Sequence, residues 1–152
     1  MEEQKLTILY PNGNREKIII EYETIGYDYL IYYDNQSFNA RTIFHAFNKM
    51  REVCFDPRGI KVLCNGARKN FILSGMAADM GDGFSGYIIK DRSIVLQLIR
   101  LLFKQRLELV YIFDYYDKPK KICSVKKQRR YINWLYGLIA QSYLFLEKRQ
   151  KS

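Results

Sequence analysis

The residues that could carry catalysis are few and widely separated in this sequence. The chain has one histidine, His45, and three cysteines, Cys54, Cys64 and Cys123. These residues lack the close ligand spacing of a structural zinc site, and they leave a serine or cysteine nucleophile without a clear partner base. We therefore expect no catalytic residue, no metal site and no cofactor, with His45 on the polar face of a helix.

Two pairs of aspartates are the remaining candidates for acid–base or metal chemistry. Asp79 and Asp82 are three residues apart in a glycine-rich segment, and Asp114 and Asp117 are three apart near the end of an expected strand. Such pairs could hold Mg²⁺ or flank a glycosidic bond, so a metal-assisted hydrolase is one alternative. Aspartate beside glycine or proline is also typical of turns. We favour the turn interpretation and expect a protein that is not an enzyme.

A run of basic residues is the second chemical feature. The formal net charge is +9, yet residues 1–117 hold 15 basic and 15 acidic residues. The excess therefore lies in residues 118–152, with ten basic residues and one acid. The basic segment 118–130 either contacts phosphates or an acidic protein, or is a solvated surface that keeps the chain soluble. The candidate nucleic-acid contacts are Lys118, Lys120, Lys121, Lys126, Lys127, Arg129 and Arg130.

A glycine-rich segment over residues 74–86 is the third feature. It has four glycines in thirteen residues but lacks the Gly-Lys-Ser/Thr of a phosphate-binding loop. Long loops of this kind are often functional. Glycine is also used where the backbone has a positive φ or passes close to another segment. Both interpretations stay open. The binding interpretation makes the candidate partner-binding residues Arg68, Lys69, Ser74, Met76, Asp79 and Asp82, with Asp114 further along the chain.

The elements that must position these residues begin with a β-meander. Residues 5–10 and 16–23 alternate between polar and apolar, and the PNGN sequence between them favours a hairpin turn. A third strand is expected over 27–33. Residues 34–37 then offer caps for a first helix from about 38 to 54, whose apolar residues recur every three or four positions.

Shorter elements and a long helix complete the chain. Ser124 is expected to cap a helix from about 125 to 148, whose basic first turns lie where the helix dipole disfavours cations. We predict one α+β domain over residues 1–152, in which a mostly antiparallel sheet is packed by the first helix and the long C-terminal helix. Short strands are expected at 60–64, 71–73, 87–90 and 107–115, and residues 93–104 fit either a helix or a strand.

The compartment follows from the N-terminus and the cysteines. The sequence MEEQK has neither the basic nor the apolar region of a signal peptide, and three unpaired cysteines suit a reducing compartment. The most apolar stretch, 131–146, has sixteen residues, fewer than the roughly 18–20 that a spanning helix needs. We predict a cytoplasmic protein without a transmembrane segment and leave its oligomeric state open.

The order of motifs between residues 60 and 135 resembles a known family. The succession CNGARKN, SGMAADMGDG, YIFDYYD and SVKKQRRYINWL is similar to that of small uncharacterised bacterial proteins associated with polymorphic toxin and secretion loci. This resemblance implies an immunity-type context but no established activity. Two features differ from the pattern of that family. The spacing between Tyr87 and Tyr111 is longer in this sequence, and the C-terminal run of basic residues has more charge. The residues that carry the resemblance are Cys64, Asn65, Gly66, Arg68, Ser74, Gly75, Met76, Asp79, Met80, Gly81, Phe113, Asp114, Gln128 and Trp134.

Two functions are compatible with these features. The first is a non-enzymatic interaction protein, most concretely an immunity-type protein that binds and neutralises a cognate bacterial toxin. The alternative is a nucleic-acid-binding module that uses the basic segment 118–130, with Tyr115, Tyr116 and Tyr131 as candidate stacking groups. We expect Tyr131 and Trp134 to lie in the core instead. A steep fall of affinity with salt would distinguish the second function from the first.

Overall fold

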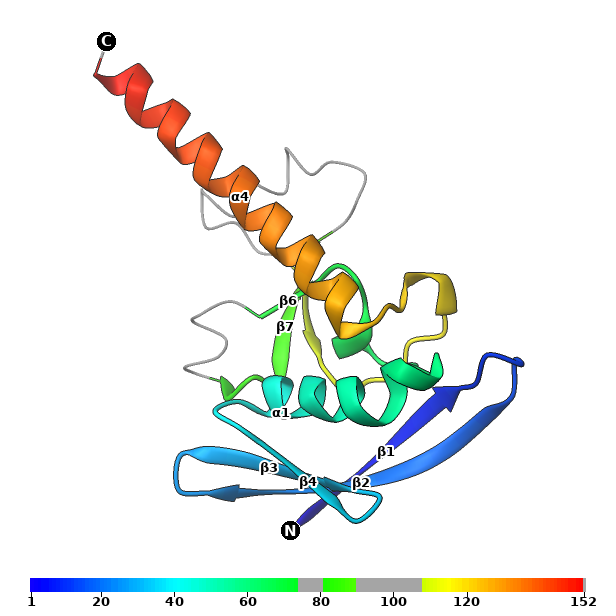
Figure 1. Ribbon diagram of the computed structural model, residues 1–152. Helices are drawn as coiled ribbons and strands as arrows, with labels where there is room; N and C mark the ends of the chain where they lie inside the picture. The colour runs from blue at the N-terminus through cyan, green and yellow to red at the C-terminus, as the bar shows by residue number, and fades with distance from the viewer. Residues whose placement is uncertain (74–80, 90–107, 152) are drawn as a thin grey trace.

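The computed structural model describes residues 1–73, 81–89 and 108–151, and within them two antiparallel sheets and two α-helices (Figure 1). Five strands form a curled sheet in the order β4-β3-β2-β1-β5, and three strands form a second sheet in the order β6-β7-β8. This arrangement confirms the predicted α+β class. Residues 93–104, whose structure the sequence left open, lie outside the described residues.

The N-terminal meander has the predicted order. The meander consists of strands β1 (Glu2–Leu9), β2 (Arg15–Ile25) and β3 (Asp28–Tyr33). Each strand pairs antiparallel with the next one along the chain. The period of two turns one set of side chains toward the core, and Leu6 of β1 therefore lies opposite Ile18 of β2, with both buried. The alternation recognised in the sequence is thus the alternation between core and solvent.

The first helix starts later than predicted, because a fourth strand takes its place. Strand β4 (Gln36–Ala40) pairs with β3 across a turn in which Asp34 and Asn35 have φ of 50° and 58°. Asp and Asn tolerate this left-handed conformation and favour tight hairpins, so residues read as helix caps form a turn instead. Helix α1 (Ile43–Met50) begins after Thr42 and continues as a π-helical turn, η1 (Arg51–Phe55).

The second sheet is built from short strands distributed over the middle of the chain. Strands β6 (Phe71–Ile72), β7 (Ser85–Ile88) and β8 (Glu108–Tyr111) pair antiparallel. Strand β5 (Lys61–Val62) instead joins the first sheet beside β1. Each of these strands falls within or beside a predicted one, and β8 is shorter because the chain turns after Tyr111, where the Asp114 N–H donates to the Tyr111 carbonyl at 3.3 Å.

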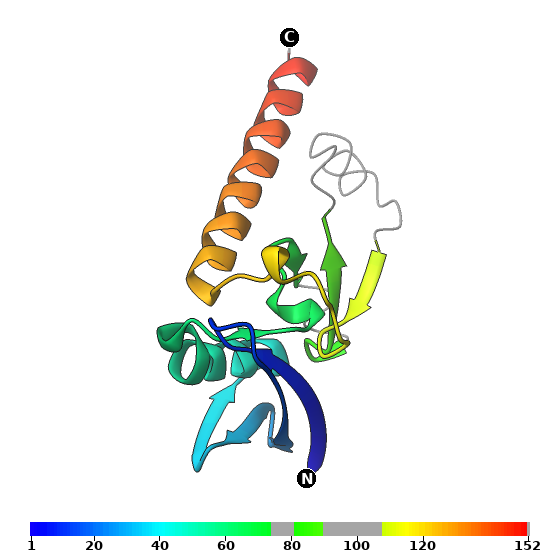
Figure 2. The same cartoon turned by 90° about the vertical axis from the view of Figure 1, so that its right-hand side faces the viewer.

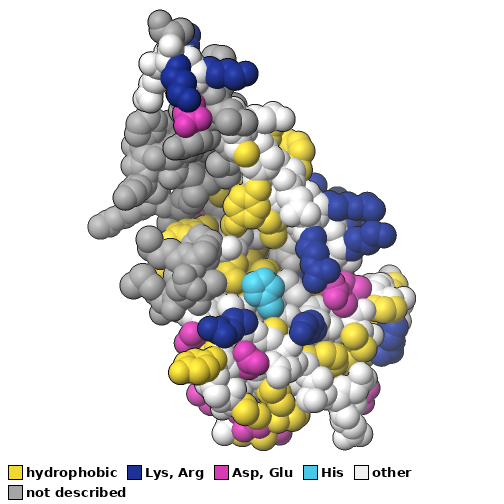
Figure 3. Space-filling model, turned by 60° about the vertical axis from the view of Figure 1, so that its left-hand side comes forward, with side chains coloured by type: hydrophobic (Ala, Val, Ile, Leu, Met, Phe, Trp, Pro, Cys, Tyr) yellow, Lys and Arg dark blue, Asp and Glu magenta, His cyan; other side chains and the backbone are white. Residues whose placement is uncertain are grey.

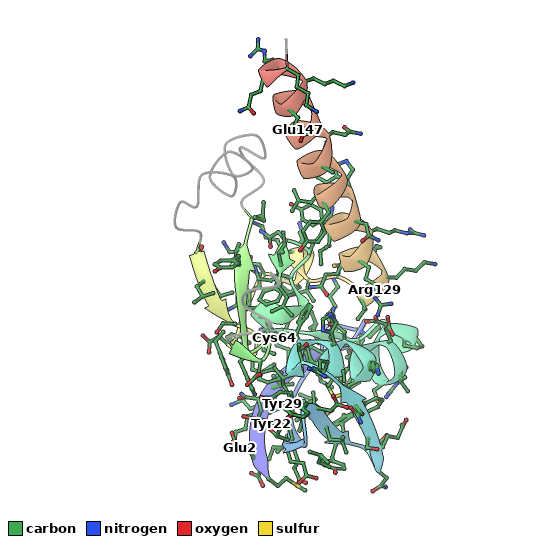
Figure 4. The ribbon with its side chains drawn as sticks, turned by 90° about the vertical axis from the view of Figure 1, so that its left-hand side faces the viewer. Glu2, Tyr22, Tyr29, Cys64, Arg129 and Glu147 are labelled. Atoms are coloured by element: carbon green, nitrogen blue, oxygen red, sulfur yellow. The ribbon has the colours of Figure 1, made fainter. Side chains whose placement is uncertain are left out.

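Aromatic rings join the two sheets. The ring centroid of Phe84, just before β7, lies 5.6 Å from those of both Tyr22 and Tyr29 and 6.1 Å from that of Tyr111, on which it is stacked. Tyr22 donates to a carboxylate oxygen of Glu2 at 2.6 Å, and burial together with this bond raises the pKa of Tyr22. Figure 4 shows Glu2, Tyr22 and Tyr29 close together within the N-terminal sheet.

The long helix α4 (Val125–Gln150) starts at the predicted residue. Its cap is Ser124, whose hydroxyl accepts from the Lys127 N–H at 3.3 Å. Twenty-six residues make a helix of about 39 Å. Buried side chains in its first turns, Val125 and Leu135 among them, pack on the body, while its far end points away from the five-stranded sheet (Figures 1 and 2). Among the described residues, no helix has an apolar stretch long enough to cross a membrane.

Candidate anion-binding cleft

A cleft of about 1010 Å³ runs along the first turns of α4. Its helical wall consists of Lys127, Arg130, Tyr131 and Trp134, which are three or four residues apart and therefore share one side of the helix. Four further parts of the chain line the cleft: Arg51 and Asp56 after α1, residues 59–62 around β5, Lys69, and several residues between 120 and 124 that lead into α4. The walls therefore come from parts of the chain that are far apart in sequence.

The cleft is strongly basic. The side chains of Lys61, Lys69, Lys120, Lys127 and Arg130 line it, together with the buried Arg51, whereas Asp56 is the single carboxylate among the lining residues that the structure describes. The two ion pairs found among the described residues, Arg15–Asp117 at 2.8 Å and Arg129–Glu52 at 2.7 Å, involve none of these cations. The cleft therefore has a surplus of positive charge.

Asp56 caps the N-terminus of α4 at one end of the cleft. Its carboxylate accepts from the Val125 N–H at 2.9 Å, so it caps α4 together with Ser124. A carboxylate is favoured at this position because the helix dipole places partial positive charge there. With the N–H groups of Val125 and Lys127 already bonded, α4 acts on a ligand through its dipole and its side chains.

Arg51 is a buried cation beneath the foot of α4, with only 2% of its surface exposed. Its Nη1 donates to the side-chain oxygens of Asn48 at 3.1 Å and Gln128 at 3.0 Å, and its Nη2 donates to the Cys123 carbonyl. Burial lowers the pKa of this guanidinium. Because the acceptors are neutral groups, its charge is not cancelled by a bonded carboxylate and adds to the field at the cleft.

A hydrogen-bonded turn fixes α4 against the body. The side-chain amide of Gln128 donates to the carbonyls of Gly66 at 2.8 Å and Arg68 at 2.9 Å. The Arg68 guanidinium lies 3.9 Å from the ring centroid of Tyr116 and donates to the Asn65 side chain at 3.2 Å. Arg68, a predicted partner contact, is therefore engaged within the fold. Gln128 thus holds α4 against the carbonyls of Gly66 and Arg68.

Two aromatic residues of α4 border the cleft with different exposure. Tyr131 is buried, as predicted, with its ring 5.5 Å from the Lys69 ammonium. Trp134 was expected in the core, but 49% of it is exposed. The ring centroids of the two residues are 5.8 Å apart. Trp134 precedes the buried Leu135 and so lies about 100° around the helix from it, which places the indole at the cleft and not in the core.

The predicted basic contacts separate into two groups. Lys120, Lys127 and Arg130 line the cleft. Arg129 instead pairs with Glu52 of η1, at the foot of α4 (Figure 4). The exposed side chains of Lys118, Lys121 and Lys126 are not among the residues that line the cleft.

Sequence reasoning missed three further residues of this cleft. Arg51, Lys61 and the exposed Trp134 belong to it, and no local pattern in the sequence marked them as neighbours. The sequence predicts Lys69 as a partner-binding residue and not as part of the basic segment. The structure places it beside Tyr131.

The acidic members of the predicted partner site lie elsewhere. Asp82 and Asp114 are exposed and do not line the cleft. The Asp82 carbonyl accepts from the Ile43 N–H at 3.0 Å at the start of α1, whereas the Asp114 carbonyl accepts from the Asn65 N–H at 3.0 Å. The structure therefore gives these two residues separate surroundings. Of the other predicted partner contacts, Ser74, Met76 and Asp79 lie outside the described residues.

The groups considered for catalysis are not assembled into a site where the structure describes them. Asp117 is held by Arg15, which lowers the pKa of its carboxyl. Cys64 is fully buried, and burial raises the pKa of its thiol to about 11, so it is not a thiolate at neutral pH. Within the described residues, no group of three or more His, Cys, Asp and Glu side chains is placed to hold a metal ion. The basic cleft is therefore the candidate site.

Comparison with known proteins adds no further constraint. No protein-family pattern and no curated protein matches this chain.

Proposed function

We propose that this protein is a nucleic-acid-binding protein that holds the phosphate backbone in the basic cleft. The observation that carries the proposal is the convergence of five cationic side chains, from four separate segments, on one concave surface without ion pairs to described residues. Lysine and arginine side chains supply most of the affinity for nucleic acids by replacing the counterions of phosphates. The planar guanidinium of Arg130 can donate two parallel hydrogen bonds to one phosphate.

The aromatic residues favour a nucleic acid over a simple anion. Tyr131 and the half-exposed Trp134 border the same cleft as the cations. Positive charge interleaved with aromatic rings is typical of surfaces that bind nucleic acids. Arg51 and the dipole of α4 add fixed positive potential without using flexible side chains.

The test compares two double variants of equal charge change. Lys127→Gln/Arg130→Gln removes two cations of the cleft, whereas Lys5→Gln/Lys17→Gln removes two exposed cations of strands β1 and β2. Fluorescence anisotropy with a labelled oligonucleotide measures the affinity of each. We expect the cleft variant to bind about tenfold more weakly or worse, because a hydrogen bond to a charged group contributes about 1.5–3 kcal/mol. The strand variant should bind like the wild type.

The proposal fails if the wild type binds no oligonucleotide at moderate salt, or if both variants lose affinity equally. Equal losses would mean that net charge alone attracts the nucleic acid. Thermal unfolding of each variant verifies that the fold is retained, since all four lysine and arginine side chains are wholly or partly exposed.

A second candidate is the immunity-type role, in which the protein binds a cognate toxin, and a surface residue favours it. Tyr27, in the turn between β2 and β3, is 85% exposed, and the Arg41 guanidinium lies 5.7 Å from its ring centroid. The neighbouring Ile25 is also exposed. Tyrosine and arginine are frequent anchors of protein–protein interfaces.

A pull-down from native lysate separates the two candidates when it includes a nuclease-treated arm. The wild type, Tyr27→Ala and Lys127→Gln/Arg130→Gln serve as baits. A stoichiometric protein that survives nuclease, is lost with Tyr27→Ala and is retained by the cleft variant supports toxin binding. Nucleic acid that is recovered with the wild type and Tyr27→Ala but lost with the cleft variant supports the first proposal.

A further inference from the structure

We infer that the cleft receives an unpaired nucleotide, whose base stacks on Trp134 while its phosphates contact Lys127 and Arg130. The inference rests on the proposed function and narrows it to single-stranded nucleic acid. DNA and RNA share the base and phosphate chemistry that this arrangement recognises, so both belong to the proposed ligand class.

The spacing along α4 is the first support. Trp134 follows Arg130 by four residues and Lys127 by seven, so the three side chains lie on the same side of the helix. With a rise of about 1.5 Å per residue, the Cα atoms of Arg130 and Trp134 are about 6 Å apart along the axis. Arg130 and Trp134 are therefore about one helical turn apart, close enough for both side chains to contact one nucleotide.

The second support is that Trp134 is both exposed and held. Half of the side chain is open to solvent, and its ring lies 5.8 Å from that of the buried Tyr131, with an angle of 41° between the planes. Lys69 is placed over the Tyr131 ring at 5.5 Å. An aromatic ring fixed before binding loses little entropy when a base stacks on it. Stacking is sequence-tolerant because every base has a π-face.

The shape of the cleft argues for an unpaired strand. In a duplex the bases are stacked on one another, so a protein ring cannot stack on them unless they are splayed out. A volume of about 1010 Å³ is also at the upper end of the range for pockets that enclose small ligands. The cleft thus has the size of a few nucleotide groups.

Trp134 is the one tryptophan in the chain, so its emission reports directly on the cleft. The experiment titrates the full-length protein with four probes of equal phosphate number: single-stranded RNA, single-stranded DNA, duplex DNA and a DNA strand with abasic sites. Base stacking quenches indole emission. We expect both single strands to quench Trp134, the abasic strand to bind without quenching, and the duplex to bind more weakly without quenching.

Variants on α4 provide the matched control. By anisotropy with labelled probes, Trp134→Ala should weaken single-strand binding by about 5- to 150-fold, the range for loss of one stacked base, while the affinity for the abasic strand stays unchanged. Trp134→Phe should recover part of the loss. Tyr136→Ala removes an aromatic residue that is 47% exposed on the same helix but does not line the cleft, and it should have no effect.

The outcomes separate this inference from the proposed function. Equal affinity for single strand, duplex and abasic strand, with unchanged Trp134 emission, overturns the stacking inference and leaves nucleic-acid binding intact. Failure of all four probes to bind overturns both. A difference between the RNA and DNA arms identifies which source of unpaired nucleotides the cleft prefers.

Discussion

Arg51 links three parts of the molecule through neutral acceptors. Its hydrogen bonds reach Asn48 on α1, the Cys123 carbonyl in the segment before α4, and Gln128 on α4. Gln128 in turn bonds the carbonyls of Gly66 and Arg68. The side chain therefore helps to set where the helical wall of the cleft stands.

Replacing Arg51 by methionine should destabilise the protein. Arg51→Met keeps a long side chain but leaves the Gln128 oxygen and the Cys123 carbonyl without this donor, and each unsatisfied buried acceptor costs about 1–3 kcal/mol. We expect the free energy of unfolding, measured by urea denaturation, to fall by about 2–6 kcal/mol. Arg58→Met, at an exposed arginine nearby, should change it by less than about 0.5 kcal/mol. An unchanged urea midpoint for Arg51→Met would contradict the assigned contacts.

His45 is exposed near the foot of α4, where the view in Figure 3 shows it beside Lys and Arg side chains. Its Nδ1 lies 2.6 Å from the Thr42 hydroxyl oxygen, which also accepts from the His45 N–H. The hydroxyl proton is then free to point to Nδ1, which suits the neutral ring. Partial desolvation, followed by the charges of Arg129 and Lys49, lowers the pKa of His45.

This lowered pKa predicts a pH-dependent stability. The unfolded chain binds a proton at a histidine pKa of about 6.5, before the folded protein does, so acid favours unfolding. The contribution of His45 is complete above about pH 6.5 and is lost as the pH falls toward the lower folded-state pKa. His45→Gln should flatten the stability profile in this window. NMR titration of the single imidazole checks the assignment, and a folded-state pKa at or above about 6.5 would refute it.

At the scale of elements, two glycines differ in whether their surroundings leave room for a side chain. Gly86 lies in β7, the central strand of the three-stranded sheet, and a Cβ there would meet the Phe71 ring and lie 2.7 Å from the Ile72 carbonyl oxygen. Gly137 lies within α4, and a Cβ there would have no neighbour within 4 Å. Gly86 therefore has no room for a methyl group, whereas Gly137 has.

Alanine at these two positions should therefore act with opposite sign. Gly86→Ala forces the ring or the strand to move, and we expect a loss of about 1–3 kcal/mol or more. Gly137→Ala should stabilise by about 0.5–1 kcal/mol, because alanine loses less backbone entropy in a helix. Thermal unfolding measures both. The packing described for β7 would be wrong if Gly86→Ala raised the midpoint.

At the scale of the whole molecule, the tertiary fold redistributes charge that is uneven along the chain. Residues 1–117 are balanced, and the excess lies in the last 35 residues. The fold adds Lys61 and Lys69 from the balanced part to Lys120, Lys127 and Arg130 of the basic part. The result is a local concentration of cations that neither part has by itself.

This concentration predicts the salt dependence of binding. If all five cleft cations contact phosphates, the logarithm of the affinity for a single strand should fall with the logarithm of the salt concentration with a slope of about −3.5, since each contact contributes about −0.7. Lys127→Gln/Arg130→Gln should reduce the slope by about 1.4, and Lys5→Gln/Lys17→Gln should leave it unchanged. A slope near zero would contradict binding through phosphates.

The amino-acid sequence alone is sufficient for the features that depend on near neighbours. The alternation of β1 to β3, the Ser124 cap of α4 and the basic excess near the C-terminus follow from local patterns, because strand pleating and helix capping involve residues close in sequence. The same local reasoning failed at residues 34–40, because Asp34 and Asn35 suit both a helix cap and a hairpin turn. Pairing with β3 decided between the two.

The cleft is a product of tertiary structure. Lys61 and Lys69 lie more than 50 residues before Lys120, Lys127 and Arg130, and no local period connects them. They meet because Gln128 binds α4 to the turn that carries Gly66, while Arg51 binds Gln128 to Asn48 of α1. The same docking decides that Tyr131 is buried and Trp134 exposed. Charge along a chain can be counted from the sequence, but which side chains face one concavity depends on contacts between distant segments.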